Sequence, residues 1–283
     1  RKVQSSFGLE QRVRSWIDHT PFLHLRIDLI NKCNLRCVMC HYNNPAYHKR
    51  PRKVVSVEEF SRLFDPIGRY VKTAMLSCAD EPLLAPSFED VLRHISERFP
   101  NVEMSFCTNG TLFDINHQKT VIESGVSRVM VSIDGVRPET FETIRRGAKF
   151  ERVLTNMINF SKLKRFLGVD WPKLQINMVL MKSNIHEAPA VVRMAKGLGA
   201  VCVEFHHAVP TWDVHVGRDQ LRHHRALFNA YRQEVVELGE KLNIEIVIPD
   251  AFPGDDASDI QIKKVTQEHV ERLWQSHSFE PIK

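Results

Sequence analysis

The chain has 283 residues, of which 43% are hydrophobic and 26% charged, and its formal net charge is +5. This length and composition predict a globular protein with a sizeable core. They exclude a membrane-spanning protein, because no apolar run approaches the roughly 18 residues that a span needs. The first residues lack a signal-peptide pattern, so the expected location is the cytoplasm. The positive charge is too small to indicate a nucleic-acid partner.

After a polar N-terminal segment, 1–22, a predicted strand over 23–30 leads directly into Cys33, Cys37 and Cys40. Half of the six cysteines lie in eight positions, which is not the pattern of a disulfide framework. A short loop with this spacing can place three sulfurs around one metal centre. Structural zinc prefers four protein ligands, whereas an iron-sulfur cluster held by three thiolates keeps one iron open. At this point both remain possible: a non-catalytic zinc or electron-transfer protein, and an enzyme with an open iron.

Strands then alternate with helices along most of the chain. The capping-box spacing of Ser56 and Glu59 predicts the start of the first helix. The predicted strands are 23–30, 73–76, 102–107, 128–133, 174–181 and 201–206, and the helices that follow Ser87 are expected at 88–95, 114–124, 138–167 and 187–198. This alternation indicates parallel pairing through right-handed crossovers. We therefore predict an α/β fold, a partial (β/α)6 TIM-like barrel over 23–210.

Residues 211–283 are expected to form a C-terminal α/β appendage to this barrel. The predicted elements are one long helix over 218–242, a strand over 244–248 and an amphipathic helix over 265–279. No repeat or low-complexity tract interrupts either part.

Polar and chemically capable side chains recur just after the predicted strands. They are Cys33, Glu81, Asn109, Asp134, Asn184 and His206. The carboxyl ends of barrel strands share one rim, which is where barrel enzymes build their sites. The sequence therefore predicts that six segments converge on one site.

The spacing Cys33-x3-Cys37-x2-Cys40 after a first strand resembles the signature of the radical SAM superfamily. The resemblance implies a 4Fe-4S cluster held by these cysteines, with S-adenosylmethionine (SAM) chelated to the open iron. It also implies an electron donor of the flavodoxin or ferredoxin type and a 5'-deoxyadenosyl radical that abstracts hydrogen from the substrate. Met39 stands where the superfamily often has an aromatic residue.

The run Cys78-Ala79-Asp80-Glu81-Pro82 resembles the superfamily's Gly-Gly-Glu-Pro turn, with Ala79 and Asp80 in place of the glycines. The resemblance implies that Glu81 lies at the amino group of SAM. Cys78 borders the expected site and is one of two candidates for a catalytic side chain. His206 is the other, and no catalytic residue is assigned from the sequence.

Further resemblance to the strand ends of the superfamily implies more cofactor-binding residues: Asn109, Ser132, Asp134, Arg145 and Asn184. Ser132 would contact the carboxylate or ribose of SAM, and Arg145 would pair with the carboxylate through its guanidinium fork.

Arg146 is the alternative to Arg145. Glu187 is expected to interact favourably with the dipole of the helix that it begins. The basic run 48–53 is interpreted as a solvated loop.

The segment from Glu271 to Phe279 resembles the helix that follows the auxiliary-cluster cysteines of SPASM and twitch-type members. No cysteine lies between Pro249 and Val265. Either the appendage is degenerate or a cysteine-bearing loop is missing from this chain, so an auxiliary cluster stays undecided. This branch implies oxidation, epimerisation or cross-linking of a peptide. The alternative is redox modification of a sugar, cyclitol or nucleoside metabolite.

Overall fold

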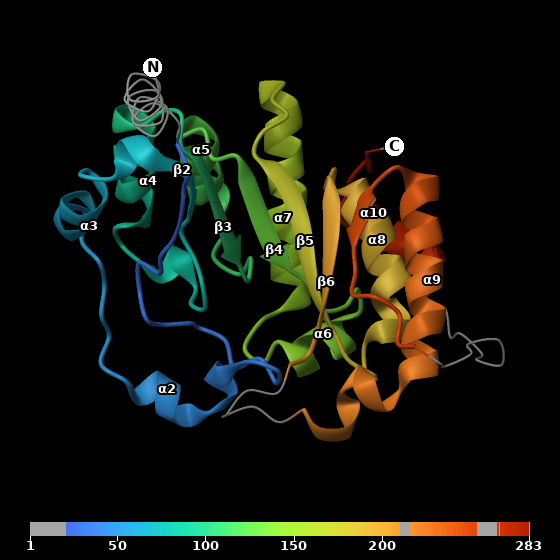
Figure 1. Ribbon diagram of the computed structural model, residues 1–283. Coiled ribbons are helices and arrows are strands. Elements are labelled where there is room, and N and C mark those ends of the chain that lie inside the picture. Colours follow the sequence, from blue (N-terminus) through green and yellow to red (C-terminus); the bar gives the residue numbers. More distant parts are fainter. Residues whose placement is uncertain (1–20, 210–215, 254–264, 266, 283) are drawn as a thin grey trace, which may run out of the picture.

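Seven parallel strands form one sheet in the order of the sequence (Figure 1). The computed structural model describes residues 21–209, 216–253, 265 and 267–282. The strands are β1 (Leu23–Arg26), β2 (Val71–Met75), β3 (Glu103–Thr108), β4 (Arg128–Ser132), β5 (Lys173–Leu180), β6 (Cys202–His207) and β7 (Glu245–Val247). Every neighbouring pair is parallel. The predicted α/β partial barrel is confirmed.

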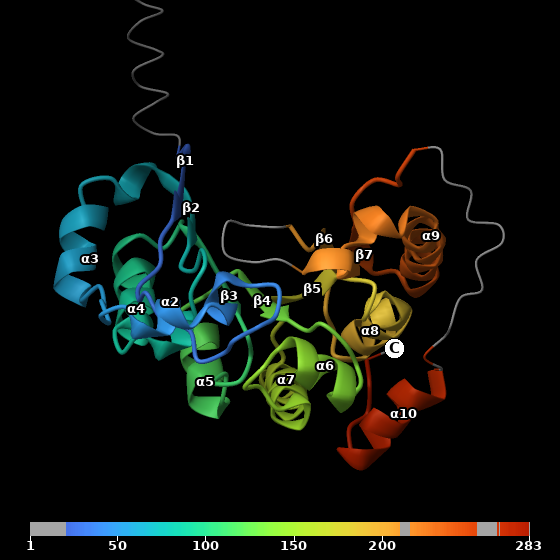
Figure 2. The same cartoon turned by 90° about the horizontal axis from the view of Figure 1, so that it is seen from below.

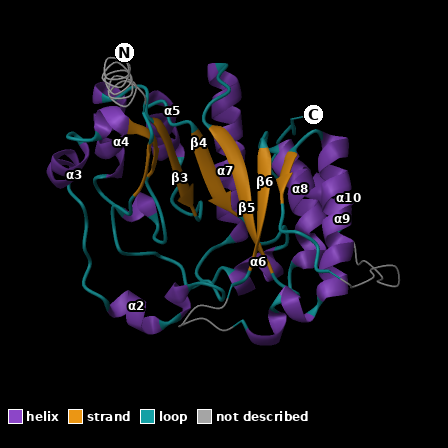
Figure 3. Cartoon of the chain, viewed as in Figure 1, coloured by secondary structure: helices purple, strands orange, loops and turns teal. Residues whose placement is uncertain are grey.

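Helices cover the outer face of the curved sheet (Figures 2 and 3). The helices are α2 (Pro45–Lys49), which lies at the rim, α3 (Val57–Phe64), α4 (Phe88–Arg98), α5 (Ile115–Glu123), α6 (Pro138–Ile144), α7 (Phe150–Leu167), α8 (Ala188–Gly197), α9 (Arg225–Leu242) and α10 (Gln267–Ser276), which packs against α8. The capping box of α3 is confirmed, because Ser56 Oγ accepts from the Glu59 N–H and Glu59 Oε2 accepts from the Ser56 N–H.

A row of phenylalanine rings fixes α4, α7 and the loop before α5 to the sheet. Phe88 contacts Phe106 of β3 at a centroid distance of 5.0 Å, Phe106 contacts Phe113 at 6.1 Å, and Phe113 contacts Phe160 at 5.0 Å. All four side chains are buried, and edge contacts of this kind add to the free energy gained from removing apolar area from water. The carboxyl end of β3 is thereby held in a fixed position.

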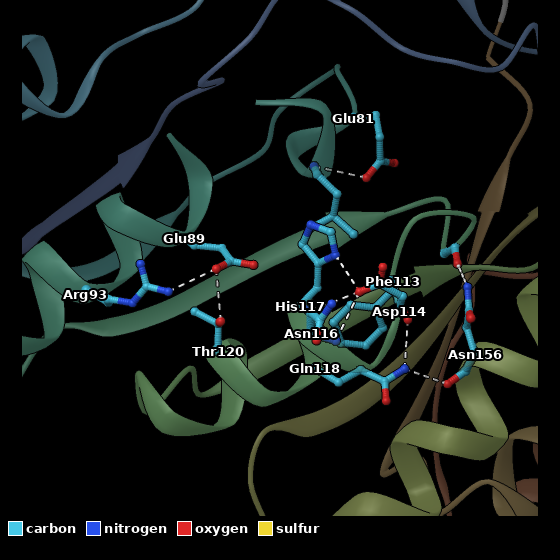
Figure 4. A network of polar contacts seen from close by, with 12 residues as sticks. Glu81, Glu89, Arg93, Phe113, Asp114, Asn116, His117, Gln118, Thr120 and Asn156 are labelled. Carbon is cyan, nitrogen blue, oxygen red and sulfur yellow. Dashed lines mark hydrogen bonds and ion pairs between the residues drawn. The ribbon is translucent and has the colours of Figure 1, made fainter. Parts of the chain in front are cut away.

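Polar side chains of α5 and α7 bind the loop that follows β3 (Figure 4). Asp114 Oδ1 accepts from the first N–H groups of α5. The buried Gln118 Nε2 donates to the carbonyls of Phe113 and Asn156, at 2.7 and 2.9 Å, and Asn156 Nδ2 donates to the Gly110 carbonyl at 2.8 Å. Because buried backbone groups need partners, these bonds fix the path of residues 109–113.

The structure differs from the sequence-based expectation in two places near the C-terminal part. Strand β7, predicted within the appendage, pairs with β6 and adds a seventh parallel strand to the barrel sheet. The predicted helix over 218–242 begins only at Arg225. Residues before it serve tertiary contacts, since Asp219 accepts from the N–H and the hydroxyl of Ser183 at 2.8 and 2.6 Å. The division of the chain near residue 210 stays a prediction.

Candidate cofactor site

A cavity of about 440 Å³ opens at the carboxyl ends of the first five strands. Its volume lies in the range of small-molecule sites. Eight of the residues singled out in the sequence line it: Cys33, Cys37, Cys40, Cys78, Glu81, Asn109, Ser132 and Arg145. The structure therefore brings together residues from five separate segments. Asp134, Asn184 and His206 are not among the lining residues.

Of the three cysteines in the loop, Cys37 is buried and Cys33 and Cys40 are partly buried. Burial raises the pKa of Cys33 to about 12 and that of Cys37 to about 11, although the nearby Arg145 partly opposes the second shift. The sulfurs are therefore neutral at pH 7 until a metal displaces their protons. No three His, Cys, Asp or Glu side chains in the described ranges are grouped closely enough to hold a single metal ion. The thiols share the wall of the cavity instead.

Three N–H groups approach the sulfurs. The Leu35 N–H and Asn109 Nδ2 lie 3.4 and 3.9 Å from Cys33 Sγ, and Arg145 Nη1 lies 3.9 Å from Cys37 Sγ. Hydrogen bonds to cluster sulfurs and burial are two levers by which a protein tunes an iron-sulfur centre. Thiolate ligands also suit this metal class. The residues present therefore fit a 4Fe-4S cluster.

The cysteine loop is bound to the connection between α6 and α7. The Arg36 N–H donates to the Arg146 carbonyl and the Val38 N–H donates to the Ile144 carbonyl, both at 2.9 Å. Arg145 lies between these two contacts and lines the cavity. Arg146, the alternative considered from the sequence, is exposed. Of the two arginines, the structure places Arg145 at the cavity.

Asp134 and Asn184 lie behind the cavity wall and are fully buried. Asp134 Oδ2 forms an ion pair with Arg145 Nε at 2.7 Å, and its Oδ1 accepts from the Val179 N–H at 2.7 Å. Burial raises the pKa of Asp134, and Arg145 opposes that shift. Asn184 Nδ2 donates to the carbonyls of Asp134 and Val179. Both side chains therefore join the ends of β4 and β5, and Asp134 orients Arg145.

Asp28 and Tyr42, which the sequence analysis missed, fix the turn over 78–81. Asp28 Oδ1 accepts from the backbone N–H groups of Cys78, Ala79 and Asp80, at 2.6, 3.2 and 3.4 Å. The Tyr42 hydroxyl donates to Asp80 Oδ1 at 2.5 Å. Side chains thus hold a turn in which the superfamily usually has two glycines. No local pattern could reveal them, because their partners are 50 and 38 residues away.

Glu81 connects three segments of the rim. Its Oε1 accepts from the Thr108 hydroxyl at 2.7 Å, its Oε2 accepts from the Asn109 N–H at 2.8 Å, and its own N–H donates to the Lys32 carbonyl. Burial raises the pKa of Glu81 to about 6, although these hydrogen bonds act in the opposite direction. A contact between Glu81 and the amino group of SAM stays a prediction.

Glu187 begins α8 as expected, but its carboxylate caps no N–H of that helix and binds the segment around Val136 instead, so the interaction with the helix dipole stays a prediction. Its Oε2 accepts from the N–H groups of Val136 and Arg137 at 2.7 and 3.2 Å, and its Oε1 accepts from Arg137 Nε and the Thr140 hydroxyl. Although burial opposes ionisation, hydrogen bonds from His186, Thr140 and Arg137 lower the pKa of Glu187 to about 2. This carboxylate joins α6 to the loop after β5.

The two candidates for a catalytic side chain differ in position. Cys78 is exposed and lines the cavity. His206 lies at the end of β6, 46% exposed, with its Nε2 3.6 Å from Glu204 Oε1. The neighbouring His207 packs on Phe228 and Phe252, at centroid distances of 4.6 and 5.3 Å. Only Cys78 of the two candidates therefore borders the cavity.

A parallel partial barrel with a three-thiol loop at its carboxyl rim defines a class of proteins that bind a metal cluster beside a small molecule. A model of the Radical SAM superfamily matches residues 27–195, more than half of the chain. The chain belongs to this superfamily, and the predicted cofactors, a 4Fe-4S cluster and SAM, are confirmed with it. No described helix is both long and apolar enough to cross a membrane.

Two curated relatives share less than a third of the matched residues with this chain. A probable GTP 3',8-cyclase of Methanocaldococcus jannaschii is 30% identical over 183 residues, which are 62% of this chain and 56% of the relative. An AdoMet-dependent heme synthase of Methanosarcina barkeri is 29% identical over 185 residues, which are 65% and 50%. The chain spans about half the length of the curated relatives it matches.

Two solved structures share the fold. SuiB of Streptococcus suis bound to S-adenosylmethionine has a TM-score of 0.67 at 15% identity, over 89% of this chain and 58% of SuiB. anSMEcpe with bound AdoMet has a TM-score of 0.60 at 18% identity, over 78% and 63%.

Proposed function

We propose that this protein takes a hydrogen atom from an unactivated C–H bond of its substrate, with Cys33, Cys37 and Cys40 holding the cluster. When bound, the 4Fe-4S cluster supplies the electron that cleaves the sulfonium of SAM and yields the 5'-deoxyadenosyl radical. The observation that carries the proposal is that the three thiols and Arg145 line one cavity of about 440 Å³.

The chain's own residues would orient the cofactor. Arg145 is suited to the cofactor carboxylate, because a guanidinium fork binds a carboxylate through two hydrogen bonds. Asp134 and the backbone contacts on either side of Arg145 keep it in place. Ser132, within 3.5 Å of Cys107, lines the same wall and would contact the carboxylate or ribose. Fixed orientation is the main lever that a protein has on a reaction of this kind.

For the substrate we propose a peptide that is oxidised, epimerised or cross-linked. Support comes from the shared fold with SuiB, which has also been solved bound to the precursor peptide SuiA, and with anSMEcpe, solved with the Cp18Cys peptide. A nucleotide substrate is the second candidate, because several relatives near 30% identity carry the name GTP 3',8-cyclase. It falls within the metabolite class considered from the sequence.

Anaerobic reconstitution with iron and sulfide tests the radical chemistry. We expect a 4Fe-4S absorption spectrum and, after reduction and addition of SAM, 5'-deoxyadenosine. Cys37→Ala should abolish both. Cys202→Ala, which removes a buried thiol on β6 outside the cavity, should retain both. A wild-type protein that forms no cluster, or forms one without yielding 5'-deoxyadenosine, would refute the proposal.

Deuterium transfer separates the two substrates. The reduced protein is incubated with SAM and either a deuterated peptide encoded near its gene or deuterated GTP, and 5'-deoxyadenosine is analysed by mass spectrometry. Deuterium from the peptide supports the peptide proposal. If deuterium is transferred from GTP and not from the peptide, the peptide proposal is wrong and a nucleotide is the substrate.

A further inference from the structure

The segment that carries the cluster cysteines holds all of the chain's excess positive charge. Residues 29–57 contain six lysines and arginines and no aspartate or glutamate, whereas the whole chain has a net charge of +5. The remaining residues therefore carry a net charge of −1. The basic residues are Lys32, Arg36, Lys49, Arg50, Arg52 and Lys53, and all except Lys32 are exposed. We call residues 49–53 with their four basic side chains the basic surface.

The basic surface is part of a folded segment beside the cysteine loop. It follows α2 at the rim onto which Figure 2 looks. Lys32 Nζ, one residue before Cys33, donates to the carbonyls of His48 and Arg50 at 2.7 and 2.5 Å. Arg52 donates to the Leu84 carbonyl at 3.0 Å. The backbone of this segment and the Arg52 guanidinium are therefore held at fixed positions relative to the cluster ligands. Residues 49–53 are exposed, in line with the prediction of a solvated loop.

Aromatic contacts lead from a cluster ligand to this surface. Cys40 Sγ lies 3.7 Å from His41 Nδ1. The His41 ring packs on the Tyr47 ring at a centroid distance of 4.6 Å, and the Arg50 guanidinium lies 3.7 Å above Tyr47. Only three successive contacts thus separate the sulfur from the basic surface. None of residues 49–53 lines the cavity, so a macromolecule bound there would leave the SAM site accessible.

We propose that an acidic one-electron carrier protein, with a reduced flavin or iron-sulfur centre, docks on the basic surface and reduces the cluster through the side of Cys40. This inference rests on the proposed function and specifies where its electron enters. One electron leaves the carrier, which is oxidised by one electron, and the cluster is reduced by one. No bond forms and no proton moves. Complementary charge raises the rate of encounter between such partners and makes that rate sensitive to salt.

The test compares a protein donor with a small donor in the reconstituted full-length protein. The variant is Lys49→Glu/Lys53→Glu, which reverses two exposed charges of the basic surface. The matched control is Lys119→Glu/Lys162→Glu, which makes the same change of charge at exposed positions on α5 and α7. Each protein is reduced either by flavodoxin hydroquinone or by photoreduced 5-deazariboflavin, a small uncharged reductant, and 5'-deoxyadenosine formation is followed with SAM.

We expect the basic-surface variant to lose about tenfold or more of its flavodoxin-driven rate at low salt. With 5-deazariboflavin its rate should stay within about twofold of wild type, and the control should match wild type with both donors. Isothermal titration calorimetry with flavodoxin should show the same loss of affinity, and raising the salt concentration should reduce the difference.

Three outcomes would overturn the inference. The first is equal loss with both donors, and the second is equal loss in the control variant. The third is a normal flavodoxin-driven rate with a raised KM for peptide, which would assign the basic surface to an acidic substrate. If wild type forms no 5'-deoxyadenosine even with 5-deazariboflavin, the proposed function fails instead.

Discussion

The substitution Glu187→Gln should destabilise the folded protein more at neutral pH than in acid. The pKa of Glu187 falls from an ordinary value of 4.5 to about 2 in the folded protein. The folded state therefore binds the proton more weakly than the unfolded state. The ionised carboxylate contributes stability that is fully present above pH 4.5 and is lost as the pH falls through 2. A shift of this size corresponds to about 3 kcal/mol at pH 7 and about 1.5 kcal/mol at pH 3.

Urea unfolding of the cluster-free chain measures the difference directly. We expect the free energy of unfolding of wild type to exceed that of Glu187→Gln by about 1.5 to 2 kcal/mol more at pH 7 than at pH 3. Other carboxylates titrate in both proteins and cancel in this comparison. Glu123→Gln, at an exposed position near the end of α5, should change stability little at either pH. An equal loss for Glu187→Gln at pH 3 and pH 7 would refute the assignment of the contacts to the ionised carboxylate.

Three further predictions concern the same rim. Gly135→Ala should lower the free energy of unfolding by about 1 to 3 kcal/mol, measured by thermal or urea unfolding. The reason is that the added Cβ would lie 2.8 Å from Glu187 Oε2. An unchanged stability would mean that the Glu187 side chain can move away. Glu81→Gln should flatten the stability profile between pH 4.5 and 6. Wild type should lose about 1.3 kcal/mol over this interval as the pH rises, because the folded state holds the proton of Glu81 more tightly than the unfolded state; an unchanged slope would contradict the raised pKa. Arg145→Gln should lower the free energy of unfolding by about 3 to 5 kcal/mol, because it leaves the buried charge of Asp134 without a partner. Adding Asp134→Asn to this variant should recover part of the loss. If the double variant recovers nothing, the ion pair is not the cause.

Local pattern was sufficient for the parts of the site that lie at strand ends. The spacing of Cys33, Cys37 and Cys40 predicted a metal-binding loop, and the rule that parallel strand ends share a rim placed Glu81 and Asn109 beside it. Arg145, in contrast, follows a helix, and only the resemblance to a family drew attention to it.

The sequence could not predict contacts whose partners are distant in the chain. Asp28 binds backbone N–H groups about 50 residues away, and Glu187 binds those of Val136 and Arg137. A carboxylate that accepts from backbone leaves no signature at the donor residues, since every residue type except proline carries that N–H. Strand β7 was misplaced for a related reason: three residues are too few to reveal which sheet they join.

The contact between Cys37 and Arg145 joins residues 108 positions apart, and the backbone bonds on either side of it span similar separations. During synthesis at roughly 5–20 residues per second, the cysteines emerge about 5–20 s before the residues that complete their pocket. During that interval the three thiols lack their contacts with residues 144–146. The contacts that complete the pocket around the three thiols can therefore form only after residue 146 has been made.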